Sequence, residues 1–466
     1  MRNLTVMRAA PAVGLLVAGL MACGQSGSPG QAAGPPQAPL ARAAAGDPPR
    51  IGVQGTTFPA HGEGWWGEAF ALRARSARGL AITPVKIDTG AMSQRQSAQV
   101  GLGSYLVNAA GDCAGCHSSP AGFLAGGVPF VLDAKGSTVW TRNLTPDPQT
   151  GLQLSLDQFK EAMRTGRDFS HPARMLVVMP WLYLRWQSDA DLAAIYAYLK
   201  AIPAVANAVP ADSKDALPLP PFIPFPGSYT DGDEVRALPE EDASFDPNRG
   251  LAIAPLALPD LGGRQARTYG IGSYIANATI GCNECHTHPD RTADGSRLNT
   301  ANHLTGGTVY ATPPPLQKPT GYVRATSANL KGATAGFFSE PGDTYARFRD
   351  LMRTGTLVDQ VPPRPLAFPM FIIAGSLRNL LDEDLGGLYA YLKRTSATTG
   401  PSDVAHQAPA RWCQAASDCH GGERCDGGQC VGGACASSDD CGTCQACSAG
   451  ACQVPAADSV CVATEN

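Results

Sequence analysis

The chain has 466 residues, more than one hydrophobic core usually serves, so its length predicts two or three domains. Its 36 Lys and Arg residues nearly balance its 40 Asp and Glu residues, which excludes the basic field of a nucleic-acid-binding protein. Charged residues make up only 16% of the chain while Gly (52) and Pro (39) are abundant, as is typical of compact domains joined by extended connections.

The N-terminus predicts export and a lipid anchor. Arg2 and Arg8 accompany a short apolar run that cannot span a bilayer stably, a pattern typical of a secretory signal. The run ends in Leu-Met-Ala-Cys at 20–23, which resembles the lipobox of bacterial lipoproteins and implies a signal peptide at 1–22 and a lipidated Cys23. The protein would then lie in the cell envelope, anchored to a membrane and facing the periplasm or the cell exterior. The alternative is an ordinary cleaved signal.

Composition divides the rest of the chain into segments. A Gly-, Ala- and Pro-rich stretch predicts a flexible tether at 23–50, followed by a lead-in segment at 51–90. Residues 203–260 are rich in Pro and predict an extended connector that lies over the domains on either side of it. Residues 410–466 hold ten of the fifteen cysteines and few large apolar residues.

Three sequence blocks occur twice, in the same order, and they predict two copies of one domain. We name the copies the first repeat (91–202) and the second repeat (261–396). The paired blocks are 101–109 with 270–278, 159–166 with 348–355, and 191–200 with 384–393.

Each repeat is expected to be helical. Apolar residues at positions i, i+3, i+4 and i+7 predict a last helix in each repeat, and helices also suit 94–110 and 264–279. Gly103 and Gly272 each cost a helix roughly 1 kcal/mol relative to Ala, so each predicts a close crossing between the first and last helices of its repeat. No alternating apolar run is long enough to predict a sheet, and the expected fold class is all-α.

Each repeat carries a Cys-x-x-Cys-His motif. Two thiols at this spacing add across the two vinyl groups of one haem, and the adjacent imidazole points at the iron. A thiol redox pair would follow a strand, and a zinc site would need two more repeated ligands, so neither alternative fits as well. The motifs predict two haem c groups, each containing iron, bound by Cys113, Cys116, His117, Cys282, Cys285 and His286.

Further motifs carry a family resemblance. In the first repeat they are Asn143-Leu-Thr-Pro-Asp147, Met163-Arg-Thr-Gly-Arg167, Met179-Pro180-Trp181 and the last helix at 191–200. This series resembles the monohaem modules in the multihaem cytochrome c subunits of membrane dehydrogenases. The resemblance covers about 90–205 well and 260–395 more loosely. It implies small all-helical class I cytochrome c domains with His and Met as axial ligands.

The distal ligand of the first haem has three candidates. Met179 matches the Met-Pro-aromatic position of the family and is favoured over Met175 and His171. Met163 lies in the Met-Arg-Thr-Gly block common to both repeats and is expected in the core.

The second repeat departs from the family pattern, because Pro369 precedes Met370 instead of following it. Met370 is still the best candidate for the distal ligand, with His303 or an open iron face as alternatives. Met352 corresponds to Met163, and His288 is too close to His286 to reach the other face. A thioether ligand favours reduced iron and so raises the midpoint potential. The first haem, whose methionine matches the family pattern, is therefore expected to be a high-potential centre, whereas the second is in doubt.

The cysteine-rich segment predicts up to five disulfides in a small module. Cys419-His420 lacks the second thioether cysteine, because position 416 is Ala. Cys441-x-x-Cys444-x-x-Cys447 could alternatively hold a metal. Disulfides are favoured because haem attachment already indicates an oxidising compartment.

Three functions remain open. The leading hypothesis is a dihaem electron-transfer lipoprotein whose partners are redox proteins, either a dehydrogenase or other cytochromes. The second is a dihaem peroxidase-like enzyme with an open second haem. The third, compatible with the first, is docking of the cytochrome to a partner through the cysteine-rich segment.

Overall fold

The computed structural model describes residues 65–132, 136–171, 175–213, 228–231, 234–239, 243–255, 263–288, 299–330, 338, 344–357, 364–396, 410–419, 424–431, 446–448 and 451–453. The expected signal peptide, Cys23 and the tether lie outside the described residues.

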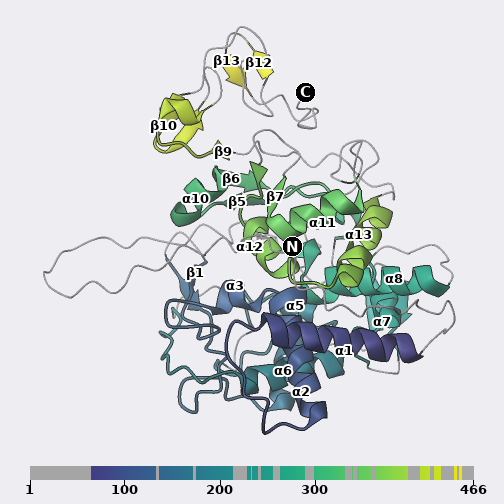
Figure 1. Cartoon of the computed structure of the whole chain (residues 1–466). Coiled ribbons are helices and arrows are strands. Elements are labelled where there is room, and N and C mark those ends of the chain that lie inside the picture. The colour runs from purple at the N-terminus through teal and green to yellow at the C-terminus, as the bar shows by residue number, and fades with distance from the viewer. Residues whose placement is uncertain are drawn as a thin grey trace, which may run out of the picture.

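The described chain is mainly helical, which confirms the expected class at that level (Figure 1). The helices are α1 Trp65–Ile82, α2 Gln94–Tyr105, η1 Leu106–Ala110, α3 Cys113–His117, α4 Leu156–Thr165, α5 Trp181–Leu184, α6 Asp189–Ala201, α7 Pro247–Ala252, α8 Gly263–Tyr274, η2 Ile275–Thr279, α9 Cys282–His286, η3 Thr300–Asn302, α10 Pro314–Thr320, α11 Tyr345–Thr354, α12 Met370–Leu377, α13 Asp382–Ser396 and η5 Ala416–Asp418.

Short antiparallel strands accompany the helices, and the sequence patterns did not predict them. Most of these strands form two-stranded ladders of two to four residues, too short for an alternating pattern to register. The strands are β1 Pro129–Val131, β2 Thr138–Trp140, β3 Ser228–Asp231, β4 Glu234–Ala237, β5 Val309–Ala311, β6 Tyr322–Thr326, β7 Thr356–Leu357, β8 Arg364–Pro365, β9 Ala410–Arg411, β10 Arg424–Asp426, β11 Gln429–Val431, β12 Ala446–Ser448 and β13 Ala451–Gln453.

The helices predicted ahead of the two cysteine motifs are confirmed. In the first repeat α2 continues into the π-helical turn η1, and in the second repeat α8 continues into η2. Ser93 and Gln96 start α2 with a reciprocal capping box, which satisfies backbone donors at the helix N-terminus. Both helices end directly before a Cys-x-x-Cys-His motif, so the motifs occupy the same place in the two repeats.

The connector is not simply extended, contrary to the prediction. It contains the hairpin of β3 and β4 and the short helix α7, which begins with Asp246 as N-cap and Pro247 in its first turn. Helix α7 packs on α8 as α1 packs on α2, through Gly250 against Gly270 and Gly79 against Gly101. The lead-in helix and the end of the connector therefore take equivalent places beside the two repeats.

The predicted glycine crossings are confirmed. A Cβ on Gly103 would lie 1.9 Å from the carbonyl oxygen of Ala194 in α6, and a Cβ on Gly272 would lie 2.0 Å from that of Gly387 in α13. The first and last helices of each repeat thus approach each other to backbone contact, which only glycine allows.

Gly103→Ala is expected to lower the free energy of unfolding by about 1–3 kcal/mol, because the added methyl overpacks the crossing of α2 and α6. Gly375→Ala is the matched control, since a Cβ on that exposed glycine of α12 would meet nothing within 4 Å. This control should gain roughly 0.5–1 kcal/mol from helix propensity. Chemical denaturation measures both, and equal stabilities would contradict the crossing.

A reciprocal set of buried polar contacts joins the two repeats. The Tyr105 hydroxyl donates to Asp384 at 2.6 Å, and the Tyr274 hydroxyl donates to Asp191 at 2.6 Å. The Phe245 ring lies between the two tyrosines, 5.9 Å from one ring and 5.7 Å from the other. Each repeat therefore fixes the start of the other's last helix, and the two repeats pack as one body.

The two contacts differ in charge. Arg75 donates to both oxygens of Asp384, at 2.9 and 2.6 Å, so that carboxylate has a buried counter-ion. Asp246 stands four residues before Gly250, as Arg75 stands before Gly79, so the equivalent chain position carries an acid instead of an arginine. Burial raises the pKa of Asp191 above its ordinary value.

The Met-Arg-Thr-Gly block recurs because its arginine ties helices together. Arg164 of α4 donates to the carbonyl of Arg185 and pairs with Asp189 at 2.8 Å, at the start of α6. Arg353 of α11 makes the matching contacts with Arg378 and Asp382. The following glycines, at 166 and 355, end their helices in the left-handed conformation.

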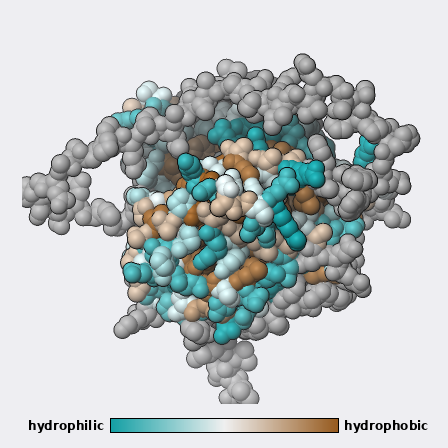
Figure 2. Space-filling model, turned by 60° about the horizontal axis from the view of Figure 1, so that its bottom comes forward, coloured by the Kyte–Doolittle hydropathy of each residue, from teal (hydrophilic) through white to brown (hydrophobic). Residues whose placement is uncertain are grey.

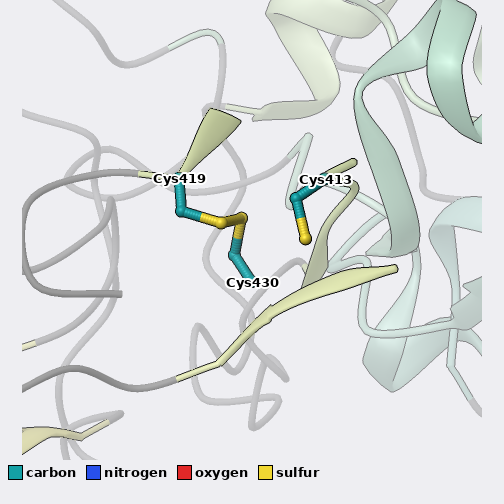
Figure 3. Close-up of side chains that lie close together, drawn as sticks. All are labelled: Cys413, Cys419 and Cys430. Carbon is teal, nitrogen blue, oxygen red and sulfur yellow. A yellow bond between two sulfur atoms is a disulfide. The ribbon is translucent and has the colours of Figure 1, made fainter. Parts of the chain in front are cut away.

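The cysteine-rich segment begins on the second repeat, because β9 pairs with β6. Two disulfides are described, Cys413–Cys425 and Cys419–Cys430. The sulfurs of Cys413, Cys419 and Cys430 lie close enough to share a metal. Figure 3 shows the disulfide between Cys419 and Cys430, and Cys413 is bonded to Cys425, so all three are already in disulfides. Cys435, Cys441, Cys444 and Cys461 lie outside the described residues, so the metal alternative for that run stays open.

None of the helices in the described ranges is both long and apolar enough to cross a bilayer. On the face in Figure 2, hydrophobic and hydrophilic residues are intermixed over the coloured surface.

Candidate functional site

The first Cys-x-x-Cys-His motif forms the one-turn helix α3, directly after η1. Cys113 is half-buried, Cys116 is exposed, and neither forms a disulfide. His117 is buried, and its Nδ1 lies 2.8 Å from the carbonyl oxygen of Arg142. A carbonyl can only accept, so Nδ1 carries the proton and Nε2 is the basic nitrogen that can bind a metal.

The second motif forms α9 and repeats this geometry. His286 Nδ1 lies 2.8 Å from the carbonyl oxygen of Ala328, and Cys282 and Cys285 are again outside any disulfide. The backbone is also alike, because Gly126 N donates to His117 O and Gly306 N donates to His286 O, both at 2.7 Å. Both histidines are thus oriented with the same ring nitrogen toward the protein.

The pKa values of the motif cysteines and histidines do not fit a thiol-exchange site and are compatible with haem attachment. Burial raises the pKa of the Cys113 and Cys282 thiols to about 12, whereas a redox-active thiol has a lowered pKa. Burial also lowers the pKa of His117 and His286 below the ordinary value, which keeps both imidazoles neutral.

A zinc site finds no further ligands here. Over the described ranges, no group of three potential metal ligands that could share an ion includes either cysteine pair. Two thiols and one neutral imidazole, repeated twice, are the donor set that a haem c uses. The residues present therefore fit that group.

Two glycines whose backbone nitrogens donate to the carbonyl oxygens of the motif histidines were not predicted from the sequence. Gly126 and Gly306 have positive φ, and a Cβ on either would meet backbone atoms at 2.4 and 2.5 Å. They let the loop after each motif approach the segment that carries the accepting carbonyl. A Gly-Gly pair in both repeats, at 126–127 and 306–307, is the signal that could have revealed them.

The three candidates for the distal ligand of the first repeat have different surroundings in the structure. Met179 is half-buried and directly precedes Pro180, the N-cap of α5. Met175 is buried and its backbone pairs with Arg167. His171 lies in a polar cluster with Asp168, and the predicted core position of Met163 is confirmed.

The second repeat arranges its candidates differently. Pro369 is the N-cap of α12, so Met370 follows the capping proline and Phe368 holds the position before it. Met352, the counterpart of Met163, also lies in the core, at 4% exposure. His303 is fully buried in the loop whose next residue, Leu304, bonds to Thr287 beside the proximal histidine.

Each motif lies beside a helix of the other repeat, the first motif beside α12 and the second beside α5. Ser376 of α12 donates to Asp112 at 2.7 Å, one residue before Cys113. A Cβ on Gly281, one residue before Cys282, would lie 3.5 Å from the ring of Tyr183 in α5. Each attachment site therefore contacts a helix of the other repeat: α12, which begins at Met370, or α5, which begins two residues after Met179.

Comparison with known proteins gives three relatives that bear on this geometry, although no family model matches the chain. It is 31% identical over 207 residues to one of the subunits of nicotinate dehydrogenase from Pseudomonas putida, covering 44% of this chain and 15% of the relative. It is 27% identical over 346 residues to the gluconate 2-dehydrogenase cytochrome c subunit of Pantoea cypripedii, covering 71% of this chain and 67% of the relative.

The third relative is the fructose dehydrogenase cytochrome subunit of Gluconobacter japonicus, 32% identical over 114 residues, with 24% of this chain and 22% of the relative covered. The match to the gluconate 2-dehydrogenase cytochrome is long enough to exceed the length of either repeat. The chain is thus a relative of the cytochrome c subunits of bacterial dehydrogenases, as its motifs predicted.

Proposed function

We propose that this protein is a dihaem cytochrome c that transfers single electrons between redox partners. The observation that carries the proposal is the duplicated motif with identical histidine orientation, His117 to the Arg142 carbonyl and His286 to the Ala328 carbonyl. Cys113 and Cys116 would hold one haem, and Cys282 and Cys285 the other. When bound, each haem supplies a one-electron couple at its iron.

The chain's own residues set how each iron is held. The carbonyl hydrogen bond fixes the tautomer of each proximal histidine and raises its basicity as a ligand. Met179 is the proposed distal ligand of the first haem, since a thioether on the loop before α5 can reach an iron face. Met370 is proposed for the second, because Met352 is committed to the core.

Packing between the repeats supports electron transfer within the chain. Asn379 donates to the carbonyl of Asn108 at 2.9 Å, and Ser376 to Asp112 at 2.7 Å, so the segment after Met370 contacts the first attachment site. Residues that hold the two haems would thereby keep a fixed separation. Electrons are proposed to enter at one haem and leave from the other.

Location and partners follow from the sequence and the relatives. The predicted haem attachment and the secretory-signal pattern of the N-terminus support a place in the cell envelope, lipid-anchored through Cys23. The relatives are named as subunits of gluconate 2-dehydrogenase and fructose dehydrogenase, which supports a dehydrogenase as the electron donor. The proposed acceptor is a second redox protein of the envelope.

One observation favours a second candidate function. Phe368, not a methionine, stands before the capping proline of α12, where the first repeat has Met179. If Met370 does not reach the second iron, that face is open and the protein is a peroxidase-like dihaem enzyme.

A redox titration followed by absorbance tests the proposal. The wild-type protein is expected to show two one-electron steps in the titration. Its oxidised form should have a low-spin ferric spectrum with the weak far-red charge-transfer band of Met sulfur bound to ferric iron. Two such ligands would exclude the open haem. A high-spin fraction equal to half of the haem would instead favour the peroxidase-like function, and a spectrum without haem would overturn both.

A further inference from the structure

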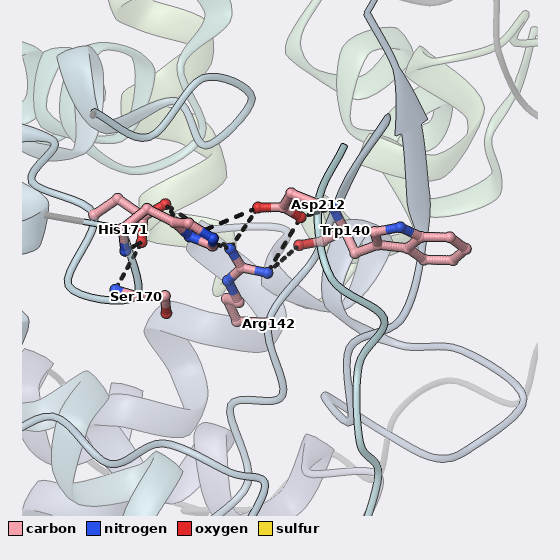
Figure 4. Close-up of polar contacts among 6 residues, drawn as sticks. Trp140, Arg142, Ser170, His171 and Asp212 are labelled. Atoms are coloured by element: carbon pink, nitrogen blue, oxygen red, sulfur yellow. Dashed lines mark hydrogen bonds and ion pairs between the residues drawn. The ribbon is translucent and has the colours of Figure 1, made fainter. Parts of the chain in front are cut away.

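Arg142 contacts the first haem site through its backbone while its side chain is held elsewhere. Its carbonyl accepts from His117 Nδ1 at 2.8 Å, and its guanidinium donates to Asp212 at 2.6 Å (Figure 4). His171 Nδ1 lies 3.4 Å from the same guanidinium. The position of the accepting carbonyl is therefore tied to the acids that hold the side chain.

We call the side chains that hold the Arg142 guanidinium the clamp; they belong to Asp212, Asp168 and His171. Asp212 is at its centre. Its side chain is 1% exposed, it pairs with Arg142, and its Oδ1 accepts from the backbone N of Trp140 at 2.8 Å. Asp168, 4% exposed, lies 3.8 Å from the guanidinium on the loop after α4. The clamp thus joins the connector, β2 and the α4 loop to one arginine.

The cluster is not a metal site of its own. Oxygens of Asp168 and Asp212 and a nitrogen of His171 lie within 4.8 Å of one another, as metal ligands do. The guanidinium of Arg142 lies among them and already supplies the positive charge that these acids require. A cation would have to displace it.

Among the described residues, the second repeat has no equivalent clamp on its proximal histidine. There the accepting carbonyl belongs to Ala328, whose side chain is a methyl group and cannot form an ion pair. The two proximal hydrogen bonds have the same length of 2.8 Å but different support. This difference lies on the histidine side of the iron and is independent of the methionines.

We propose that Asp212 is a positioning residue of the first haem, which it tunes by clamping Arg142 behind His117. The inference rests on the proposed function. A firmly placed carbonyl increases the basicity of His117, and Asp212 offsets the positive charge of the Arg142 guanidinium; both favour ferric iron. The connector therefore lowers the potential of the first haem relative to an unclamped site, partly offsetting the effect of Met179.

Asp212→Asn tests this directly. The amide oxygen can still accept from Trp140, but one negative charge is lost and the pair with Arg142 is weakened. The midpoint potential of the first haem is expected to rise while that of the second stays unchanged. In ¹⁵N-histidine-labelled ferrous protein, one axial Nδ1–H signal should move and the other should not.

Two further variants keep the test specific. Ser213→Ala is the matched control, because Ser213 ties the same segment to Thr138 at 2.9 Å without touching Arg142, and it should leave both potentials unchanged. Arg142→Lys keeps the charge and the carbonyl but not the fork, so it should raise the first potential less than Asp212→Asn does. Met179→His identifies the first step, because a bis-His iron titrates lower.

Equal shifts in Asp212→Asn and Ser213→Ala would overturn the positioning role, as would unchanged potentials and Nδ1–H signals in Asp212→Asn. If Asp212→Asn does not fold, Arg142→Lys decides, and an unchanged first potential there overturns the inference. A wild-type protein without haem would overturn the proposed function as well, and that result differs from all the others.

Discussion

Arg75→Met is expected to lower the free energy of unfolding by about 3–5 kcal/mol, because it leaves a charge buried without its counter-ion. The side chains of Arg75 and Asp384 are 3% and 1% exposed, and two hydrogen bonds run from the guanidinium to that carboxylate. The Tyr105 hydroxyl bonds to the same carboxylate, so the substitution also loosens the contact between the repeats. Denaturant titration monitored by circular dichroism measures the loss.

Two variants separate charge burial from lost packing. Arg75→Met combined with Asp384→Asn should recover part of the stability, since the double variant buries no unpaired charge. Arg78→Met removes a neighbouring arginine of α1 whose Nε donates to the uncharged carbonyl of Asn379, and should cost less. A similar loss for Arg78→Met and Arg75→Met would show that the ion pair contributes nothing special.

Met179→Leu is expected to remove the sulfur ligand from the first iron. Its ferric spectrum should become high-spin, its midpoint potential should fall, and the Met-to-iron band should drop to roughly half if Met370 binds the other iron. Absorbance of the oxidised protein and a redox titration measure these changes. Covalent haem content should stay the same, because the cysteine motif is untouched.

Met163→Leu is the matched control for that variant. Met163 belongs to the buried core of the first repeat, so a shape-conserving change should keep the band and cost less than about 1.5 kcal/mol of stability. Loss of the band in Met175→Leu, with the band retained in Met179→Leu, would reverse the assignment.

The helices at 94–110, at 264–279 and at the end of each repeat were predicted from local sequence patterns, whereas the 18-residue helix α1 was not. The regions 94–110 and 264–279 fold as expected because their apolar spacing and small residues agree with close helix packing. Helix α7 was not predicted, since six residues inside a Pro-rich connector are too short to show a helical period. The β-hairpins were not predicted either, because their strands are too short to show an alternating pattern.

The site was predictable only where it is local. Cys-x-x-Cys-His is a contiguous motif, whereas the carbonyls that orient its histidines come from 25 and 42 residues further along the chain. The Tyr105–Asp384 contact spans 279 residues. Asp212 lies 70 residues from Arg142, in a segment where the sequence carried no signal. Such pairings are set by the tertiary packing, which no local pattern encodes.

Each repeat is proposed to bind one haem through its own pair of cysteines. Intact-mass spectrometry of the purified protein, followed by proteolysis and mapping of the haem peptides, tests it most directly. We expect the mass of two haems on the polypeptide, one on a peptide with Cys113 and Cys116 and one on a peptide with Cys282 and Cys285. A haem-free mass, or a disulfide within either motif, would contradict the account.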